Sequence, residues 1–246
     1  IIHNLNNSIE LITRMNTKES LEQAKKLAGY KAVDDCLKSG LRVGIGSGST
    51  IKYVVDRIKE LGLNVTCVPT SFQSTQLIVQ AGLTLSDLSL TPELDITIDG
   101  ADEVDRDLNL IKGGGACQLQ EKVVAYASKQ MVVVADYTKD SEHFGQQWKK
   151  GIPIEVVPMA YVPVMKKLAT MSLRPVLRMA VNKAGPVVSD NGNFIIDAQF
   201  DTLNDVPAIA TQIKMIPGVV ETGLFVNVAC RAYFGQADGT VKERQR

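Results

Sequence analysis

Three clusters of glycines and polar residues each follow an apolar run, and their residue types suit anion binding and acid–base catalysis. The first is Gly44-Ile-Gly-Ser-Gly-Ser-Thr50, between a predicted strand and a predicted helix. Glycines let the backbone approach a ligand, and free N–H groups at a helix N-terminus attract anions. We expect a phosphate group here, with hydroxyl donors from Ser47, Ser49 and Thr50. A tight strand–helix turn without a ligand is the alternative interpretation.

Two better-known phosphate motifs do not fit this segment. The sixth position of the dinucleotide pattern G-x-G-x-x-G is Ser49, and no acidic residue ends the next apolar run at residues 65–68. The segment also lacks the Gly-Lys-Ser/Thr ending of a P-loop. The glycine pattern therefore gives no reason to expect a nucleotide cofactor.

The second cluster, Asp99-Gly-Ala-Asp-Glu-Val-Asp105, directly follows an apolar strand. A calcium loop of the EF-hand type needs oxygen ligands at positions 1, 3 and 5 and a glutamate at position 12. Positions 3 and 12 are Ala101 and Leu110, so this metal interpretation fails. Carboxylates at the mouth of a sheet suit sugar hydroxyls, which they bind as acceptors and can deprotonate. We therefore expect Asp99 and Asp102 to hold a sugar, with a solvated acidic turn as the alternative.

The third cluster is Lys112-Gly-Gly-Gly-Ala-Cys117, and the helix predicted over about residues 119–128 contains Glu121. Glycines cost about 0.5–1 kcal/mol each in a regular element, so three in a row favour a loop that approaches a ligand. Enolisation beside a carbonyl requires a base for the carbon-bound proton and a cation for the charge that grows on oxygen. We expect Glu121 to be that base and Lys112 that cation, and a surface glutamate on a helix is the alternative.

The elements around these clusters alternate between strands and helices from residue 17 to about residue 150. The alternation predicts an α/β fold with a mostly parallel, Rossmann-like sheet covered by helices. Ligands bind beyond the carboxyl ends of such strands, where all three clusters lie. After Gly151 the order β-α-β-β-α-β, with a hairpin signal at Asn191-Gly192, predicts a smaller α+β, ferredoxin-like domain. We expect residues 1–150 and 219–246 to form the catalytic domain and residues 151–218 the small one.

Composition and charge narrow the possible functions. Lys plus Arg and Asp plus Glu both number 27, so no global field would draw the chain to nucleic acid or to a membrane. The four cysteines and two histidines lie far apart, which predicts neither a disulfide framework nor a zinc site, and indicates reduced thiols in the cytoplasm. No apolar run approaches the ~20 residues of a membrane span. Residues 1–16 make a poor signal peptide and are assigned no chemistry.

In their order and spacing, GIGSGST, DGADEVD and KGGGAC followed by Glu121 resemble ribose-5-phosphate isomerase of the A type. The resemblance continues through Val134-Ala-Asp-Tyr-Thr-Lys139, Gly151-Ile-Pro-Ile-Glu-Val-Val-Pro-Met159 and Ile216-Pro-Gly-Val-Val220, and it covers about residues 25–240. It implies an aldose–ketose isomerase that interconverts D-ribose 5-phosphate and D-ribulose 5-phosphate in the non-oxidative pentose phosphate pathway. It further implies that the reaction uses no metal and no organic cofactor, and that the protein is a homodimer or homotetramer.

The same resemblance implies roles for individual residues. Glu121 matches the base that moves a proton between C2 and C1 through an enediolate, and Lys112 matches the catalytic lysine. Asp99 and Asp102 match aspartates that hold sugar hydroxyls, one of which assists ring opening. Many members have Thr where this chain has Ser47, a swap that keeps the hydroxyl. The predicted substrate contacts are Lys25, Ser47, Gly48, Ser49, Thr50, Gly100, Ala101, Gly113, Gly114, Gly115 and Lys139.

Two other functions stay open on the residues alone. A related sugar-phosphate isomerase or deaminase would use the same kind of fold, and release of ammonia from an aminosugar phosphate would distinguish it. A non-catalytic sugar-phosphate sensor would need no pair of Lys112 and Glu121, and it would usually bring a DNA-binding helix-turn-helix. The N-terminal segment is too short and not basic enough for that motif.

Overall fold

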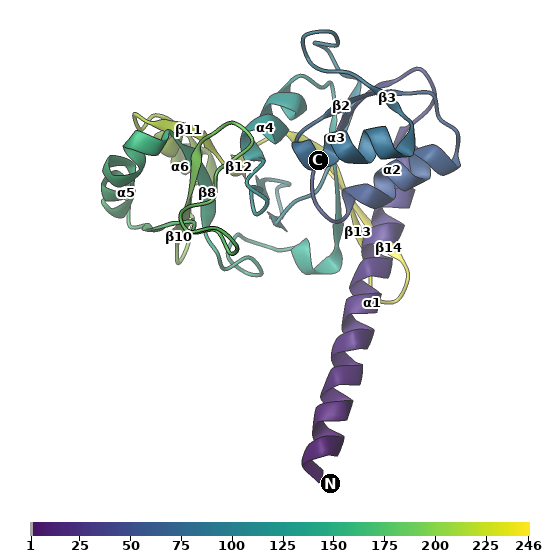
Figure 1. Ribbon diagram of the computed structural model, residues 1–246, viewed down its shortest axis with the longest axis horizontal. Coiled ribbons are helices and arrows are strands. Elements are labelled where there is room, and N and C mark those ends of the chain that lie inside the picture. Colours follow the sequence, from purple (N-terminus) through teal and green to yellow (C-terminus); the bar gives the residue numbers. More distant parts are fainter. Residues whose placement is uncertain (1) are drawn as a thin grey trace.

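The computed structural model describes the backbone of residues 2–246 and the side chains of residues 18–246. Two bodies of secondary structure lie side by side, one around a large sheet and one around a smaller sheet (Figure 1). The side chains of residues 1–16, for which no chemistry is predicted, fall outside the described side chains.

The large sheet has seven strands in the order β14-β13-β7-β4-β1-β2-β3. All neighbouring strands in it are parallel except β14, which forms an antiparallel edge against β13. The predicted α/β fold with a mostly parallel sheet is thereby confirmed. The strands are β1 (Arg42–Ile45), β2 (Thr66–Pro69), β3 (Thr84–Leu85), β4 (Ile96–Asp99), β7 (Met131–Asp136), β13 (Ala229–Gly235) and β14 (Val241–Gln245).

Both faces of this sheet are covered, as a parallel sheet requires. Along β7 the side chains alternate between two cores: Val132 and Val134 pack with α1 and α2, whereas Met131 and Val133 pack on the opposite face with Phe225. Helix α4 lies against that second face. The helices of this body are α1 (Ile2–Cys36), α2 (Ile51–Glu60), α3 (Phe72–Ala81) and α4 (Gln118–Tyr126).

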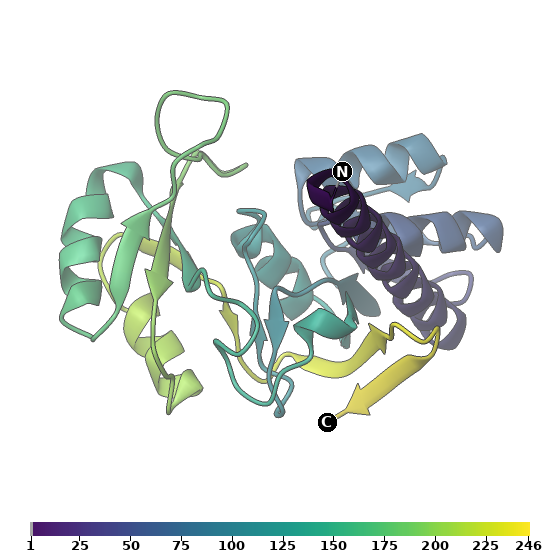
Figure 2. The ribbon, with the colours of Figure 1, turned by 90° about the horizontal axis from the view of Figure 1, so that it is seen from below.

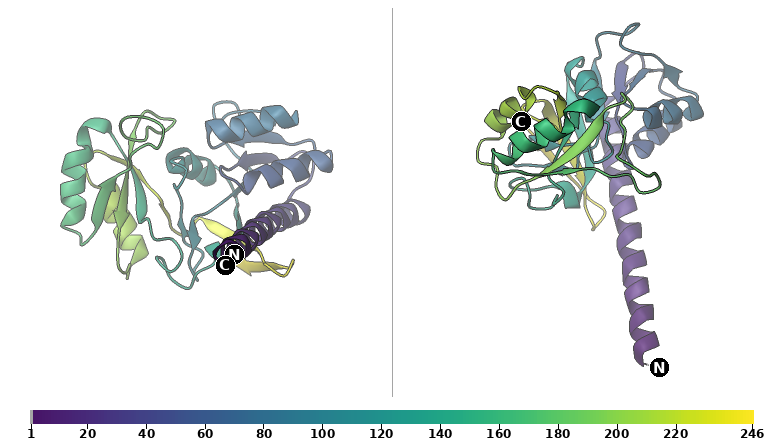
Figure 3. Two further views of the ribbon diagram at one scale, coloured as in Figure 1. Left: turned by 60° about the horizontal axis from the view of Figure 1, so that its bottom comes forward. Right: turned by 60° about the vertical axis from the view of Figure 1, so that its left-hand side comes forward.

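Helix α1 begins at Ile2, well before the helix start expected near residue 17. No glycine or proline occurs between residues 2 and 28, so no residue type in that stretch interrupts a helix. Its C-terminal half packs on the large sheet, and its N-terminal half extends away from the rest of the molecule (Figure 3). None of the helices in the described part of the chain is both long enough and apolar enough to span a membrane.

The second body is a four-stranded antiparallel sheet in the order β11-β8-β10-β9, with two helices (Figure 2). The predicted order β-α-β-β-α-β is confirmed. Its own apolar core includes Ile152, Ile154, Val164 and Leu168. The elements are β8 (Ile152–Val156), α5 (Tyr161–Ala169), β9 (Arg174–Leu177), β10 (Phe194–Gln199), α6 (Val206–Lys214) and β11 (Val219–Thr222).

Two details of this body differ from expectation. The turn at Asn191-Gly192 exists, but the segment before it makes isolated bridges, from Val188 to Phe194 and from Pro186 to Met179, and no strand. Strand β10 pairs instead with β8 and β9, so the hairpin partner is β9, at the far end of a long loop. Strand β11 belongs to this sheet, and the chain rejoins the large sheet at β13. The exact limits of the two domains stay a proposal.

A three-stranded sheet links the two bodies in the order β12-β6-β5. Its strands are two residues long, too short for a periodic sequence signal. They matter for the site because β6 ends immediately before Lys112. The strands are β5 (Glu103–Val104), β6 (Leu110–Ile111) and β12 (Leu224–Phe225), and two short 3-10 helices are η1 (Tyr137–Lys139) and η2 (Pro158–Ala160).

Candidate active site

The polar clusters meet at the carboxyl ends of four adjacent parallel strands, β2, β1, β4 and β7. A cleft of about 590 Å³ opens there, large enough for a small sugar phosphate. Residues from the turns after all four strands line it, together with residues of the glycine loop at 113–115 and of helix α4. The strand-end position expected from the sequence is confirmed for the first two clusters, whereas the third, from Lys112 to Cys117, follows β6 of the three-stranded antiparallel sheet and reaches the cleft from there.

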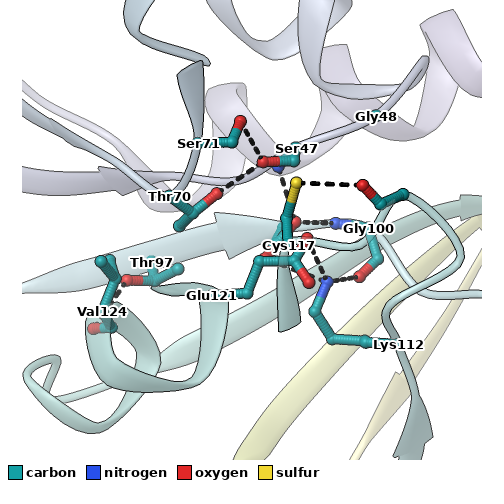
Figure 4. A network of polar contacts seen from close by, with 12 residues as sticks. Ser47, Gly48, Thr70, Ser71, Thr97, Gly100, Lys112, Cys117, Glu121 and Val124 are labelled. Atoms are coloured by element: carbon teal, nitrogen blue, oxygen red, sulfur yellow. Dashed lines mark hydrogen bonds and ion pairs between the residues drawn. The ribbon is translucent and has the colours of Figure 1, made fainter. Parts of the chain in front are cut away.

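The glycine-rich turn after β1 contains two kinds of hydroxyl. Ser47 is engaged within the protein, because its amide donates to Asp99 Oδ1 (3.0 Å) and its hydroxyl contacts those of Thr70 (2.8 Å) and Ser71 (2.6 Å) (Figure 4). Ser49 and Thr50 also line the cleft, and the Thr50 hydroxyl makes no capping bond to α2. Since α2 begins directly after them, its positive end adds to their attraction for an anion.

Two lysines add positive charge to the cleft. Lys25 reaches it from α1 and donates to Glu22 Oε1 at 2.8 Å. Glu22 also accepts from the Tyr53 hydroxyl (2.8 Å), and hydrogen bonds from Lys25 and then Tyr53 lower its pKa to about 2. The permanently charged Glu22 therefore holds Lys25 in place. Lys139 lines the cleft from η1.

Lys112 lies between two buried carboxylates. Its Nζ is 3.0 Å from Asp99 Oδ2 and 3.1 Å from Glu121 Oε1, and it donates a hydrogen bond to the Gly100 carbonyl (2.6 Å) (Figure 4). The side chains of Lys112, Asp99 and Glu121 are 3%, 0% and 6% exposed, so little water screens their charges. The other oxygen of Glu121, Oε2, is buried and accepts no hydrogen bond from the described residues.

These charges shift the titration of the cluster. Burial first, and then the Asp99 carboxylate, raise the pKa of Glu121 from 4.5 to about 8, although Lys112 opposes them. Burial lowers the pKa of Lys112, but Asp99 and Glu121 outweigh it and hold that pKa above its ordinary value. The ammonium therefore stays charged at neutral pH, while Glu121 can both take and return a proton.

The loop after β4 and the glycine loop hold each other. The Gly114 amide donates to Asp102 Oδ2 at 2.7 Å. A Cβ at Gly114 would lie 2.4 Å from Asp102 Oδ1, and one at Gly46 would lie 2.0 Å from Asp99 Oδ1, so only glycine permits either approach. Burial raises the pKa of Asp102, against the Gly114 amide and nearby cations.

Residues 66–239 match the family model described as Ribose 5-phosphate isomerase A (phosphoriboisomerase A). The ribose-5-phosphate isomerase of Dictyostelium discoideum is 75% identical over 227 residues, which cover 91% of this chain and 98% of that protein. The chain belongs to the ribose 5-phosphate isomerase A family.

Other members of the ribose 5-phosphate isomerase A family agree in sequence and fold. The ribose-5-phosphate isomerase of Homo sapiens is 57% identical over 236 residues, 94% of this chain and 76% of that protein. A solved D-ribose-5-phosphate isomerase in complex with phospho-erythronic acid superposes with a TM-score of 0.87 at 35% identity, covering 92% of this chain and 99% of that one. The α/β fold expected from the sequence is therefore the fold of the family.

Every residue predicted for the site of this family member lines the cleft except Asp99. Asp99 is fully buried and contacts Lys112, so it faces the ammonium rather than the cleft. The catalytic and binding roles of all these residues stay predictions. Among the side chains that the structure describes, no group of three or more His, Cys, Asp or Glu residues is arranged to hold a metal ion.

The cleft also contains residues that sequence reasoning missed. Ser71 follows β2 and Asp136 is the last residue of β7, so the strand-end rule that found the other clusters could have found them. Gln73 accepts a hydrogen bond from the Gly48 amide (2.8 Å). Asp190 comes from the turn before β10, in the second body, and accepts one from the Phe72 amide (2.9 Å), a contact for which the sequence has no local signal.

Proposed function

We propose that this chain interconverts D-ribose 5-phosphate and D-ribulose 5-phosphate in the cleft, with Glu121 as the base. Family membership and the close relatives support the activity. One observation supports the base: Glu121 has one oxygen paired with Lys112, and the other is buried beside the cleft with no hydrogen-bond partner among the described residues. A carboxylate held in this way is oriented, yet free to take a proton.

The proposed reaction begins with ring opening, for which Asp102 lies in the cleft as an acid–base group. Glu121 then removes the proton from C2 of the open aldehyde. The electron pair moves to the C1 oxygen, and the resulting enediolate is stabilised by the Lys112 ammonium. Glu121 returns its proton to C1 while the C2 hydroxyl loses its proton to the C1 oxygen. Atoms and charge balance without a further reactant.

The proposed substrate orientation follows from charge. Lys25, Lys139 and the hydroxyls of Ser49 and Thr50 would take the phosphate, and the cluster around Lys112 would take the reacting carbons. Phospho-erythronic acid, the ligand of the solved relative, is by its name a sugar acid that carries a phosphate and a carboxylate. We propose that it binds this cleft as a mimic of the enediolate. We propose a homodimer or homotetramer on the family resemblance alone, and a cytoplasmic location on the wide spacing of the four cysteines.

The activity is tested with purified protein, ribose 5-phosphate and excess EDTA. We expect ribulose 5-phosphate to form at the same rate with and without EDTA, and no ammonia to be released from an aminosugar phosphate. If EDTA abolished the activity and magnesium or manganese restored it, this result would indicate that Asp99 and Asp102 bind a metal ion. No turnover at all would contradict the proposed function.

Removing a phosphate contact should weaken substrate binding more than catalysis. We expect Lys25→Ala and Ser49→Ala to raise KM by roughly tenfold with little change in kcat, because a charge-assisted contact remote from the reacting carbons is lost. Lys26→Ala is the matched control, since the neighbouring Lys26 is exposed and does not line the cleft. Steady-state kinetics with ribose 5-phosphate give both constants. An unchanged KM in both test variants would show that the phosphate of the substrate does not bind at Lys25 and Ser49.

The raised pKa of Glu121 predicts a pH dependence. A base must be deprotonated, so kcat/KM should rise about tenfold per pH unit below an apparent pKa of about 8 and level off above it. The measurement is kcat/KM for ribose 5-phosphate from pH 5.5 to 9.5 (roughly the span on either side of that value). A kcat/KM that is already level at about pH 5.5, as the ordinary glutamate pKa of 4.5 would give, would contradict the assignment of Glu121.

A further inference from the structure

Arg178 connects the second sheet to the glycine loop of the candidate active site. It follows strand β9, and its backbone amide donates to the Ile195 carbonyl of β10 (2.8 Å), so the sheet fixes its position. Its guanidinium forms a two-point ion pair with Asp197 of β10, at 2.8 and 2.5 Å. The remaining nitrogen, Nη1, donates to the carbonyls of Gly113 (2.9 Å) and Gly114 (3.1 Å).

These contacts converge on one peptide group. The Gly113 carbonyl and the Gly114 amide belong to the same peptide unit, which accepts from Arg178 at one end and donates to Asp102 at the other (2.7 Å). A donor at the carbonyl polarises the peptide and strengthens the hydrogen bond that its amide makes. A continuous chain of contacts therefore runs from Asp197 through Arg178 to Asp102.

The glycine loop has few other means of staying in place. Residues 113–115 carry no side chains, and only Gly113 is buried, where its carbonyl also accepts from the Ala116 amide (2.9 Å). Gly114 and Gly115 are exposed, so packing does not fix this part of the loop. Only an arginine offers a planar fork that binds a carboxylate with two nitrogens and still has a third donor for a carbonyl. The Arg178 and Asp197 side chains are 16% and 17% exposed, which shields the pair from water. The positive charge of Arg178 also opposes the burial that raises the pKa of Asp102.

We infer that Arg178, held by Asp197, is a positioning residue for the isomerisation: it fixes the peptide between Gly113 and Gly114 and thereby the carboxylate of Asp102. The second sheet thus contributes to catalysis without touching the substrate. This inference rests on the proposed function, since Asp102 matters only if the cleft handles a sugar.

The test compares Arg178→Ala, Arg178→Lys and Asp197→Asn with a matched control, Arg174→Ala. Arg174 lies in β9, four residues before Arg178, and makes the same kind of two-point pair, with Asp201 (2.9 and 3.0 Å), but does not contact the glycine loop. A misplaced catalytic group costs roughly 10²-fold, so we expect kcat of Arg178→Ala to fall by about 10- to 100-fold. Lysine can replace one donor of Arg178 but not its planar fork, and asparagine keeps only part of the ion pair with Arg178. The kcat values of Arg178→Lys and Asp197→Asn should therefore lie between those of Arg178→Ala and wild type. Arg174→Ala should stay within twofold of wild type.

Two further measurements separate positioning from a general loss of structure. Inhibition by inorganic phosphate should be unchanged in Arg178→Ala, because its proposed contacts are Lys25, Lys139 and the hydroxyls after β1. Amide hydrogen exchange over residues 112–117 should be faster in Arg178→Ala than in wild type, with exchange elsewhere in the large body unchanged. A kcat within twofold of wild type in Arg178→Ala, or unchanged exchange over residues 112–117, would overturn the inference. A general increase in exchange would also overturn it, because the role would then be structural.

The two proposals fail in distinguishable ways. If wild-type protein does not turn over ribose 5-phosphate, the proposed function fails, whereas the exchange measurement still tests the contact between Arg178 and the glycine loop. If wild type is active and the Arg178 variants match it, the positioning role fails alone.

Discussion

Replacing Glu121 with Gln should lower kcat by roughly 10²–10⁴-fold, the usual worth of a positioned base. The amide has nearly the same volume as the carboxyl, so the helix and the cleft should keep their shape. Exchange of the C2 proton of ribose 5-phosphate with deuterated solvent should slow by the same factor, because the base that exchanges it is gone. Rates of isomerisation and of exchange, measured on the same samples, check both expectations.

Binding and stability provide independent checks of this variant. Affinity for phospho-erythronic acid should change far less than kcat, since the phosphate contacts remain. The unfolding free energy should not fall at pH 8 or above, because wild type must bury a charged Glu121 there and the amide avoids that cost. Glu93→Gln, an exposed carboxyl-to-amide change, is the matched control and should leave kcat unaltered. A Glu121→Gln enzyme with turnover within threefold of wild type would remove Glu121 as the base.

The location of the site could be predicted from the sequence because it depends on a local rule. Apolar runs that end in Gly-rich or acidic segments identify strand ends, and parallel strands place their carboxyl ends on one edge. The turn around Ser47, the loop around Asp102 and Lys139 after β7 all follow that rule. Their meeting in one cleft follows from strand order, for which β1, β4 and β7 are neighbours.

The internal geometry of the site could not be predicted, because it depends on contacts between distant segments. Asp99 directs Oδ2 toward Lys112 and Oδ1 toward the Ser47 amide, and the missing Cβ of Gly46 leaves room for this carboxylate. The Ser47 hydroxyl is hydrogen-bonded to the hydroxyls of Thr70 and Ser71. These hydroxyls meet only because of the register between β1 and β2. Arg178 meets the glycine loop across 65 residues of sequence. Two-residue strands such as β6 have no pattern to detect, yet β6 sets the position of Lys112.

Replacing Lys112 with Met should have the second large effect, on both turnover and stability. The ammonium neutralises Asp99 and Glu121 at 3.0 and 3.1 Å in a nearly water-free environment. Loss of one electrostatic stabiliser of a transition state costs roughly 10²–10³-fold in kcat. Removing one partner from a buried ion pair costs about 3–5 kcal/mol, because the remaining charge has no compensation. We expect both losses at pH 8, measured by initial rates and by urea unfolding.

The stability loss in Lys112→Met should depend on pH in a defined direction. Without the ammonium, the pKa of Glu121 in the folded state should rise further above its unfolded value of 4.5, since Lys112 is the group that lowers it. A carboxyl whose pKa is raised by folding binds its proton more tightly in the native state, so stability is greatest at low pH and falls as pH rises through the folded pKa. The part of the difference from wild type that Glu121 causes should therefore open as the pH rises above about 8, because below that value Glu121 is protonated in both folded proteins.

Lys122→Met is the matched control for this variant. Lys122 is also a mostly buried lysine with a carboxylate partner, Glu221 at 2.9 Å, but it does not line the cleft. Removing Lys122 should reduce stability, while kcat of the folded protein stays within about threefold of wild type. The lost ion pair stabilises the fold equally in the substrate complex and in the transition state, so its loss does not change the barrier. A Lys112→Met enzyme that loses stability as Lys122→Met does, yet keeps its kcat, would show that Lys112 only neutralises buried charge. Both variants lose a buried ion pair, but only Lys112→Met also loses the cation beside the reacting carbons. A large loss of kcat in Lys112→Met and not in Lys122→Met would therefore indicate that the Lys112 ammonium stabilises the enediolate.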